Sequence, residues 1–162
     1  MPANIREFNP ADALNVNALA LRAFEQFQSA YNDWPAFRAR VAGMSSLADA
    51  GELLVAEIDG QLAGAVAYIG PGKPKPDFFR PEWAIMRMLV VSPDFRGQGI
   101  GRALAEKCLQ RAKRDKARFF ALHTSTIMQV ALPMYLRMGF QKALEAPSIY
   151  GVEYGVYLKK TA

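Results

Sequence analysis

Cysteine and histidine are almost absent from this sequence, which contains one of each among 162 residues. The lone cysteine, Cys108, excludes a disulfide bond within the chain and a zinc site built from several cysteines, so we expect no metal and a reducing compartment. Long apolar runs are also absent, because no segment approaches the ~18 residues of a membrane span. The N-terminus reaches a charge at Arg6 before an apolar leader could form. These absences predict a cytoplasmic protein with no membrane partner.

Apolar residues and positive charge are what the sequence does contain. Hydrophobic residues make up 51% of the chain, and a domain of this length buries roughly 70% of the surface of its unfolded chain. We therefore expect residues 1–162 to form a single domain, without room for a second. The net charge of +5 suits an anionic partner such as a phosphorylated cofactor, a nucleic acid or an acidic membrane.

Strand and helix patterns follow one another along the chain. Asp59-Gly60 favours a two-residue hairpin turn, and the four prolines of residues 70–81 require an exposed loop. Residues 85–91 are nearly continuous in apolar side chains, as in a strand buried on both faces. The predicted strands cover residues 5–8, 52–58, 61–69, 85–91, 119–122 and 154–158. The first predicted helix starts after Asn9-Pro10, and its Leu14, Leu21, Phe24 and Phe27 face a core. A second, shorter helix ends at about residue 44. Two further helices cover residues 102–116 and 127–138. This order indicates an α/β fold with a mixed sheet covered by helices.

A glycine-rich turn directly follows the apolar strand and reads Arg96-Gly97-Gln98-Gly99-Ile100-Gly101-Arg102. Glycine permits positive φ angles and a close approach of the backbone to a ligand, and free amides at the start of the next helix favour an anion. A dinucleotide fingerprint needs a third glycine where Arg102 stands, and a P-loop needs lysine followed by serine or threonine there. The turn therefore predicts a phosphate site of another kind.

The turn has the pattern R-x-x-G-x-G over residues 96–101, and Tyr135-Leu136-Arg137-Met138-Gly139-Phe140 follows it some thirty residues later. Together these segments resemble the GNAT superfamily of acyl-CoA-dependent N-acyltransferases, and the order of elements from Ile5 to Leu158 also follows that fold. The resemblance implies a mixed central sheet of about six to seven strands flanked by about four helices. It also implies acetyl-CoA as cosubstrate and a small-molecule or peptide amine as acceptor.

The resemblance implies roles for individual residues as well. Main-chain groups of Leu89 and Val91 pair with the pantetheine arm of coenzyme A in a gap between the fourth and fifth strands. The Leu89 amide also polarises the thioester carbonyl. Tyr135 matches the general acid that protonates the leaving thiolate beside the bound cofactor. The amides of Gln98, Gly99, Gly101 and Arg102 hold the pyrophosphate, and Arg96 and Gly97 belong to the same cofactor site.

Two positions depart from the family pattern. Ile85 stands where an acid is often found near the start of the fourth strand, although an ammonium group must lose a proton before it attacks. Glu82 is the nearest carboxylate, and His123, which closes the fifth strand beside the gap, is a candidate base. Met128 replaces an asparagine that donates a hydrogen bond to pantetheine in many relatives. Pro133 is expected to kink the last predicted helix and re-aim its tyrosine.

These features predict an N-acetyltransferase in which a primary amine directly attacks acetyl-CoA in a ternary complex. A non-catalytic acyl-CoA-binding module or sensor is the alternative, because Ile85 and Met128 depart from the pattern. A nucleic-acid binder is a weaker third interpretation, since the basic residues after the turn are interspersed with Glu106 and Asp115, and we expect no such partner. The acceptor stays open among polyamines, amino acids, aminoglycosides and protein amino groups. The C-terminal strand is a candidate pairing edge for a homodimer.

Overall fold

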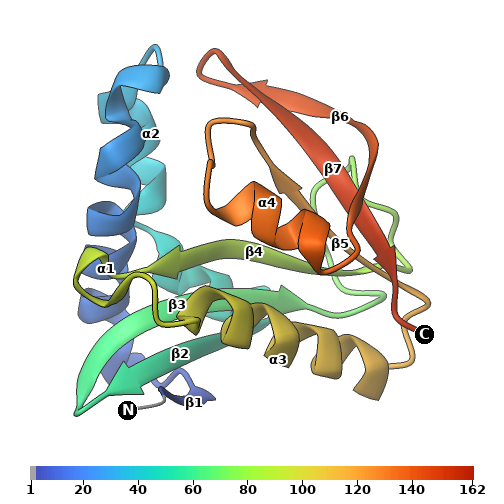
Figure 1. The fold of residues 1–162 in the computed structure, drawn as a ribbon, viewed down its shortest axis with the longest axis horizontal. Helices are drawn as coiled ribbons and strands as arrows, with labels where there is room; N and C mark the ends of the chain where they lie inside the picture. Colours follow the sequence, from blue (N-terminus) through green and yellow to red (C-terminus); the bar gives the residue numbers. More distant parts are fainter. Residues whose placement is uncertain (1–2) are drawn as a thin grey trace.

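A computed structural model describes residues 3–162, in which one seven-stranded sheet carries helices on both faces (Figure 1). The sheet has the order β1-β2-β3-β4-β5-β7-β6, and β4 and β5 form its parallel pair while the other neighbours are antiparallel. This arrangement confirms the predicted mixed sheet. The strands are β1 (Asn4–Glu7), β2 (Glu52–Ile58), β3 (Gln61–Ile69), β4 (Ala84–Val91), β5 (Phe119–Thr124), β6 (Gln141–Ile149) and β7 (Val152–Lys160). The α-helices are α1 (Ala13–Phe24), α2 (Trp34–Val41), α3 (Ile100–Arg114) and α4 (Ala131–Arg137).

The central strands are apolar because both of their faces are covered. In β2, Leu53 and Val55 pack with the buried side chains of α1 and α2, whereas Leu54 and Ala56 pack with those of α3. Successive side chains of a strand point to opposite faces, so a strand covered on both sides needs apolar residues at every position. The predicted hairpin is confirmed as well, since Asp59 and Gly60 have φ angles of 50° and 79° between β2 and β3.

The first helix buries a different stripe from the one expected. Its buried side chains are Val16, Leu19, Ala20 and Ala23, whereas Leu14 is 84% exposed. The prediction that Leu14 faces a core is wrong, because the buried stripe repeats from Val16 at steps of three and four residues and Leu14 lies on the opposite side of the helix. Apolar residues near the end of a helix do not have to follow its buried stripe.

The helix predicted over residues 127–138 is shorter than expected. It begins at Ala131, so Pro133 is its third residue, in the first turn where amides have no partner within the helix. The proline therefore costs no helical hydrogen bond, and the expected kink is wrong. Residues 127–130 form turns instead, in which the Met128 amide donates to the Ser125 carbonyl at 3.0 Å.

The C-terminal part of the sheet contains a strand that the sequence did not reveal. β6 is largely exposed along its length and pairs with β7 alone, which itself lies between β5 and β6. The C-terminal strand is therefore not an edge, and the prediction of a pairing edge there is wrong. Within residues 3–162, no helix combines the length and apolar character that crossing a membrane requires.

Gly64 allows α3 to lie directly on β3. A Cβ atom built at this position would meet Ile100 Cγ2 at 2.9 Å, Leu104 Cδ1 at 3.0 Å and the Val90 carbonyl oxygen at 3.0 Å. The missing side chain thus determines how closely the start of α3 approaches β3.

Replacing Gly64 with alanine should lower the free energy of unfolding by about 1–3 kcal/mol, because the added methyl group overpacks this contact. Urea denaturation of the purified protein measures the change. Gly43→Ala is the matched control, since a Cβ there meets only the Arg40 carbonyl oxygen at an ordinary 3.5 Å. Equal stability of the two variants would contradict the argument.

Candidate functional site

β4 and β5 separate soon after they begin to pair, as Figure 1 shows. Their register holds only Ala84 opposite Phe120 and Ile85 opposite Ala121. Further along, Met88 has a φ angle of 58°, and the register of β4 with β3 shifts between Ala65 and Ala67. An extra residue of this kind bends a strand and increases its local twist. The later part of β4 therefore has no partner strand on its β5 side, and it is here that Leu89 and Val91 lie.

The glycine turn presents a row of free amides beside this gap. Gly97 and Gly99 have φ angles of 79° and 76°, a region that favours glycine. No hydrogen bond within the part of the chain that the structure describes uses the amides of residues 98–102, and the first helical bond of α3 comes from Ala103 to Gly99. These amides also carry the positive end of the α3 dipole. The turn therefore offers donors suited to an anion without using a metal.

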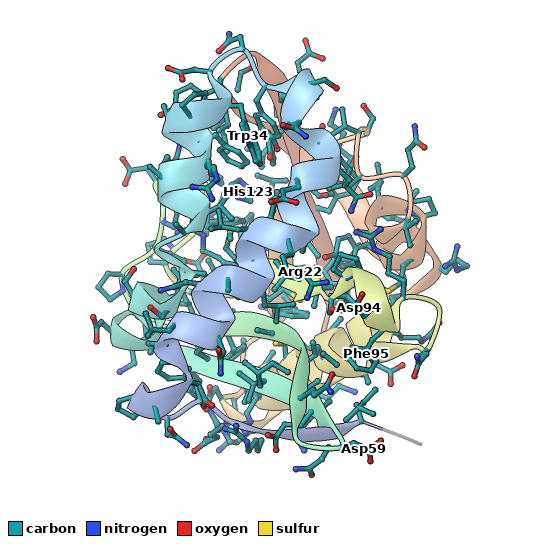
Figure 2. All side chains as sticks on the ribbon, turned by 90° about the vertical axis from the view of Figure 1, so that its left-hand side faces the viewer. Arg22, Trp34, Asp59, Asp94, Phe95 and His123 are labelled. Carbon is teal, nitrogen blue, oxygen red and sulfur yellow. The ribbon has the colours of Figure 1, made fainter. Side chains whose placement is uncertain are left out.

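Arginine side chains at the turn differ in what they contact. The Arg102 guanidinium pairs with Glu106 at 3.0 Å, which leaves its main-chain amide as the free donor. Arg96 is exposed. Asp94, in the segment that leads into the turn, pairs with Arg22 of α1 at 2.9 Å (Figure 2). The turn is thereby connected to the helix that covers the opposite face of the sheet.

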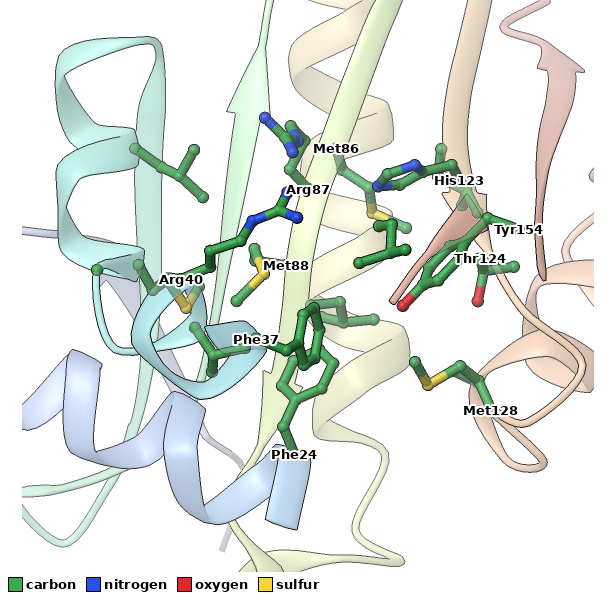
Figure 3. Close-up of a pocket in the computed structure, with 18 of the residues that line it drawn as sticks. Phe24, Phe37, Arg40, Met86, Arg87, Met88, His123, Thr124, Met128 and Tyr154 are labelled. Atoms are coloured by element: carbon green, nitrogen blue, oxygen red, sulfur yellow. The ribbon is translucent and has the colours of Figure 1, made fainter. Parts of the chain in front are cut away.

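A cavity of about 220 Å³ lies at the gap and brings together residues from distant segments (Figure 3). Leu89, His123 and Tyr135, the three predicted catalytic residues, all line it. Met128, the second position expected to depart from the family pattern, lines it as well. The opposite wall comes from α1, α2 and the segment that follows α2, including Phe24, Phe37, Arg40 and Met44.

Tyr135 is held by the end of α4. The Phe140 amide donates to the Tyr135 carbonyl and the Gly139 amide to the Leu136 carbonyl, both at 3.1 Å, with Gly139 at a φ angle of 99°. This is the Schellman arrangement that ends helices at glycine. The Phe140 ring packs edge-on against the tyrosine ring with centroids 5.8 Å apart. Burial raises the pKa of Tyr135, so its hydroxyl is protonated at neutral pH and can act as an acid.

His123 is half-buried among aromatic rings and has an unsatisfied nitrogen. Its ring stacks on Phe78 with centroids 5.0 Å apart and lies 5.2 Å from the Tyr154 ring. The buried Nδ1 atom has no hydrogen-bond partner among the described residues. Burial, followed by the positive charges of Arg87 and Arg40, lowers its pKa from 6.5 to about 4. The imidazole is therefore neutral at pH 7, able to accept a proton but weakly basic.

No carboxylate lines the cavity where it is described. Glu82 lies away from it, exposed and 3.7 Å from Arg80, so the structure does not support Glu82 as a nearby base. Ile85 is fully buried, in a cluster with Phe79 and Trp83. Its side chain therefore belongs to the core of the protein.

Arg87 and Arg40 are cavity residues that the sequence interpretation missed. Arg87 did have a recognisable signal, because it is the one charged residue among the apolar side chains of residues 85–91. A lone charge in a buried strand is costly unless something pairs with it. Arg40 had no comparable signal in the amphipathic sequence of α2.

Comparison with known proteins agrees with this geometry. A sequence model of the Acetyltransferase (GNAT) family matches residues 15–140. The chain belongs to this family, and the resemblance found in the sequence is confirmed.

Relatives and solved structures show how far the likeness extends. Rat (Rattus norvegicus) N-acetyltransferase 8F1 is 42% identical over 92 residues, which are 57% of this chain and 40% of that protein. Mouse (Mus musculus) N-acetyltransferase 8B is 43% identical over 88 residues, or 54% of this chain and 37% of that protein. The chain thus spans about two fifths of the length of these relatives. Ard1 from Thermoplasma volcanium has the same fold, with a TM-score of 0.77, 18% identity and coverage of 99% and 98% of the two chains. YncA from Salmonella typhimurium, solved with its cofactor acetyl-CoA, has a TM-score of 0.70, 17% identity and coverage of 100% and 95%.

The environment of His123 predicts a stability change with pH. Its folded-state pKa lies below the unfolded value, so the unfolded chain gains a proton first as the pH falls from 6.5 towards 4. The stabilisation that the neutral ring provides is nearly complete at pH 7.5, and about 2 kcal/mol of it is lost when the pH falls to 5. Urea denaturation at the two pH values should show that His123→Gln loses less stability than the wild type by this amount. Parallel losses in both proteins would contradict the burial of a neutral ring.

Proposed function

We propose that this protein is a single-domain N-acetyltransferase that moves an acetyl group from acetyl-CoA to a primary amine by direct attack in a ternary complex. The observation that carries the proposal is a continuous path, from the free amides of the glycine turn, along the unpaired part of β4, to a cavity lined by Tyr135. Family membership supports the same reaction.

The donor side of this path fits coenzyme A chemically. Charge-assisted hydrogen bonds from amides to phosphate contribute about 1.5–3 kcal/mol each, so the amides from Gln98 to Arg102 can hold a pyrophosphate, with Arg96 and Gly97 beside them. The main chain at Leu89 and Val91 can pair with the amides of the pantetheine arm. The thioester supplies the acetyl group, and no metal is needed.

The acceptor side supplies the remaining chemistry. An ammonium group first loses a proton, to water or to the neutral His123 ring, and the neutral amine then attacks the thioester carbonyl. The Leu89 amide stabilises the oxyanion, an effect worth roughly 2.7–4 kcal/mol per donor in other enzymes. When the carbon–sulfur bond breaks, the Tyr135 hydroxyl gives its proton to the thiolate. The products are an N-acetylated amine and free coenzyme A.

A non-catalytic acyl-CoA-binding module is the second candidate. The absence of a carboxylate from the described lining of the cavity and the weak basicity of His123 favour it. Acetyl-CoA incubated with a panel of amines and assayed for free thiol separates the two functions. Tight acetyl-CoA binding with no thiol release from any amine would favour the binding module.

The compartment in which the protein acts and its oligomeric state belong to the same proposal. The buried, free Cys108 is in keeping with a reducing cytoplasm. If the protein forms a homodimer, the exposed β6 offers the sheet edge on the C-terminal side.

Replacing Tyr135 with phenylalanine should lower kcat by roughly 100-fold, the low end of what general acids contribute. Acetyl-CoA affinity should stay the same, because the ring and its packing against Phe140 are kept. Steady-state kinetics with calorimetric titration of acetyl-CoA measures both quantities. Tyr157→Phe is the control, a buried tyrosine in the same core that does not line the cavity. Unchanged turnover in Tyr135→Phe would remove this residue from the mechanism.

Replacing Gly99 with aspartate should weaken acetyl-CoA binding by roughly 100-fold, because a carboxylate beside the turn repels the pyrophosphate and crowds its amides. Calorimetry measures the affinity. Gly72→Asp is a matched control, since the φ angles of the two glycines are 76° and 78° and a Cβ at either meets nothing within 4 Å. Backbone strain is thus equal in the two variants. Wild-type affinity in Gly99→Asp would remove the turn from the cofactor site.

A further inference from the structure

Two arginines line the cavity with no carboxylate to balance them. Arg87 comes from β4 and Arg40 from α2 (Figure 3), and neither forms an ion pair with a described residue. The cavity lining in the described chain includes no aspartate or glutamate. By contrast, Arg6, Arg22, Arg102, Arg111 and Arg114 all pair with carboxylates elsewhere in the molecule.

Arg87 is the more unusual of the two. Its Nε atom is buried and has no hydrogen-bond partner among the described residues. Burial, and then the positive charge of Arg40, lowers its pKa. Burying a charged group without a partner is costly. A guanidinium in such a place has the donors and the planar geometry to bind a carboxylate through two parallel hydrogen bonds.

The position of Arg87 relates this free charge to the reaction. It lies two residues before Leu89 on β4, separated from it by the left-handed Met88, and both residues line the cavity. An anion on Arg87 would therefore sit a short distance from the place where the Leu89 amide meets the thioester. This spacing suits a small acceptor whose amine and carboxylate are close together.

The same charges act against other acceptors. Two arginines with no acid beside them repel polyamines and aminoglycosides, which carry several positive charges. The rest of the wall includes apolar side chains, among them Phe24, Phe37, Met44, Met86 and Met88. An apolar substituent on the acceptor would contact these residues.

An anionic acceptor would also change the surroundings of His123. Burial is the main cause of its lowered pKa, and the positive charges of Arg87 and Arg40 lower it further. A carboxylate bound between them offsets their effect and makes the ring a better proton acceptor when the acceptor is present. A ring whose basicity rises when the acceptor binds fits a cavity without a carboxylate of its own.

We propose that the acceptor is a free amino acid, with an apolar side chain, whose carboxylate is bound by Arg87 and Arg40. This inference rests on the proposed acetyltransferase function and narrows the amine to one class. It also assigns both arginines to acceptor specificity.

Matched pairs of acceptors test the proposal. Glycine, leucine, methionine and phenylalanine are each compared with the corresponding carboxamide, and free coenzyme A is measured. The amine of a carboxamide is less basic than that of its parent amino acid, so reactivity alone favours the carboxamide. The proposal expects the reverse, with kcat/KM higher by roughly 10- to 100-fold for at least one apolar amino acid.

Arginine variants provide the second comparison. Arg87→Met should raise KM for the preferred amino acid by roughly tenfold or more and leave KM for its carboxamide unchanged, while Arg87→Lys retains part of the preference. Arg40→Met should act in the same direction. Arg38→Met is the matched control, an exposed arginine of α2 that does not line the cavity. Circular dichroism and acetyl-CoA titration check the fold and the cofactor site of each variant.

The outcomes separate this inference from the proposed function. Thiol release that is equal or faster with carboxamides, or that occurs only with other amines, overturns the amino acid assignment and leaves the acetyltransferase intact. Weaker acetyl-CoA binding in Arg87→Met would assign the arginine to the cofactor and also overturn it. A wild-type protein that neither binds acetyl-CoA nor releases thiol with any amine removes both proposals together.

Discussion

The left-handed backbone at Met88 is the constraint on which the site depends. A residue with a side chain pays a free-energy cost of roughly 1–2 kcal/mol in this conformation, and here it accompanies the register shift between β3 and β4. β4 keeps its antiparallel partner but leaves its parallel one after Ile85. The sheet stays continuous at one end and opens at the other. The row of free amides and the cavity both border this opening, so a single distortion provides space for the two substrates that we propose.

The sequence predicted those parts of the molecule whose structure is determined locally. Glycines at positive φ, a strand with both faces buried and a helix ended by glycine each have a pattern over a few residues, and so the turn and the Tyr135 segment could be recognised. β6 had no such pattern, because an exposed edge strand needs no apolar alternation and this one also contains Pro147. The two arginines of the cavity lining could not be predicted from the sequence for another reason. Arg40 and Arg87 meet only after two segments 47 positions apart have folded, and pairing of this kind leaves no local trace.

The charge of the protein is distributed unevenly. On α3, Arg111 pairs with Glu7 and Glu52, and Arg114 pairs with Glu52 and Asp115. These contacts use the donors that a nucleic acid would need from that helix, so they weaken the interpretation of α3 as a phosphate-facing helix. The Arg87 guanidinium in the cavity has a different cost, because its buried Nε atom has no hydrogen-bond partner among the described residues. Among the arginines that the structure describes, Arg87 is thus distinguished by a buried donor without a partner.

The cap of α4 has a consequence for how this family motif can vary. Tyr135 supplies a carbonyl oxygen to the amide of Phe140, and Phe140 supplies a ring to Tyr135. Gly139 has the φ angle that closes the link. The tyrosine and the glycine-phenylalanine pair are therefore one mechanical unit, although they are separated in sequence. A substitution at Gly139 would change the backbone at the end of α4 and so displace the Tyr135 hydroxyl. Selection that acts on Tyr135 as an acid must therefore also act on Gly139, which ends its helix.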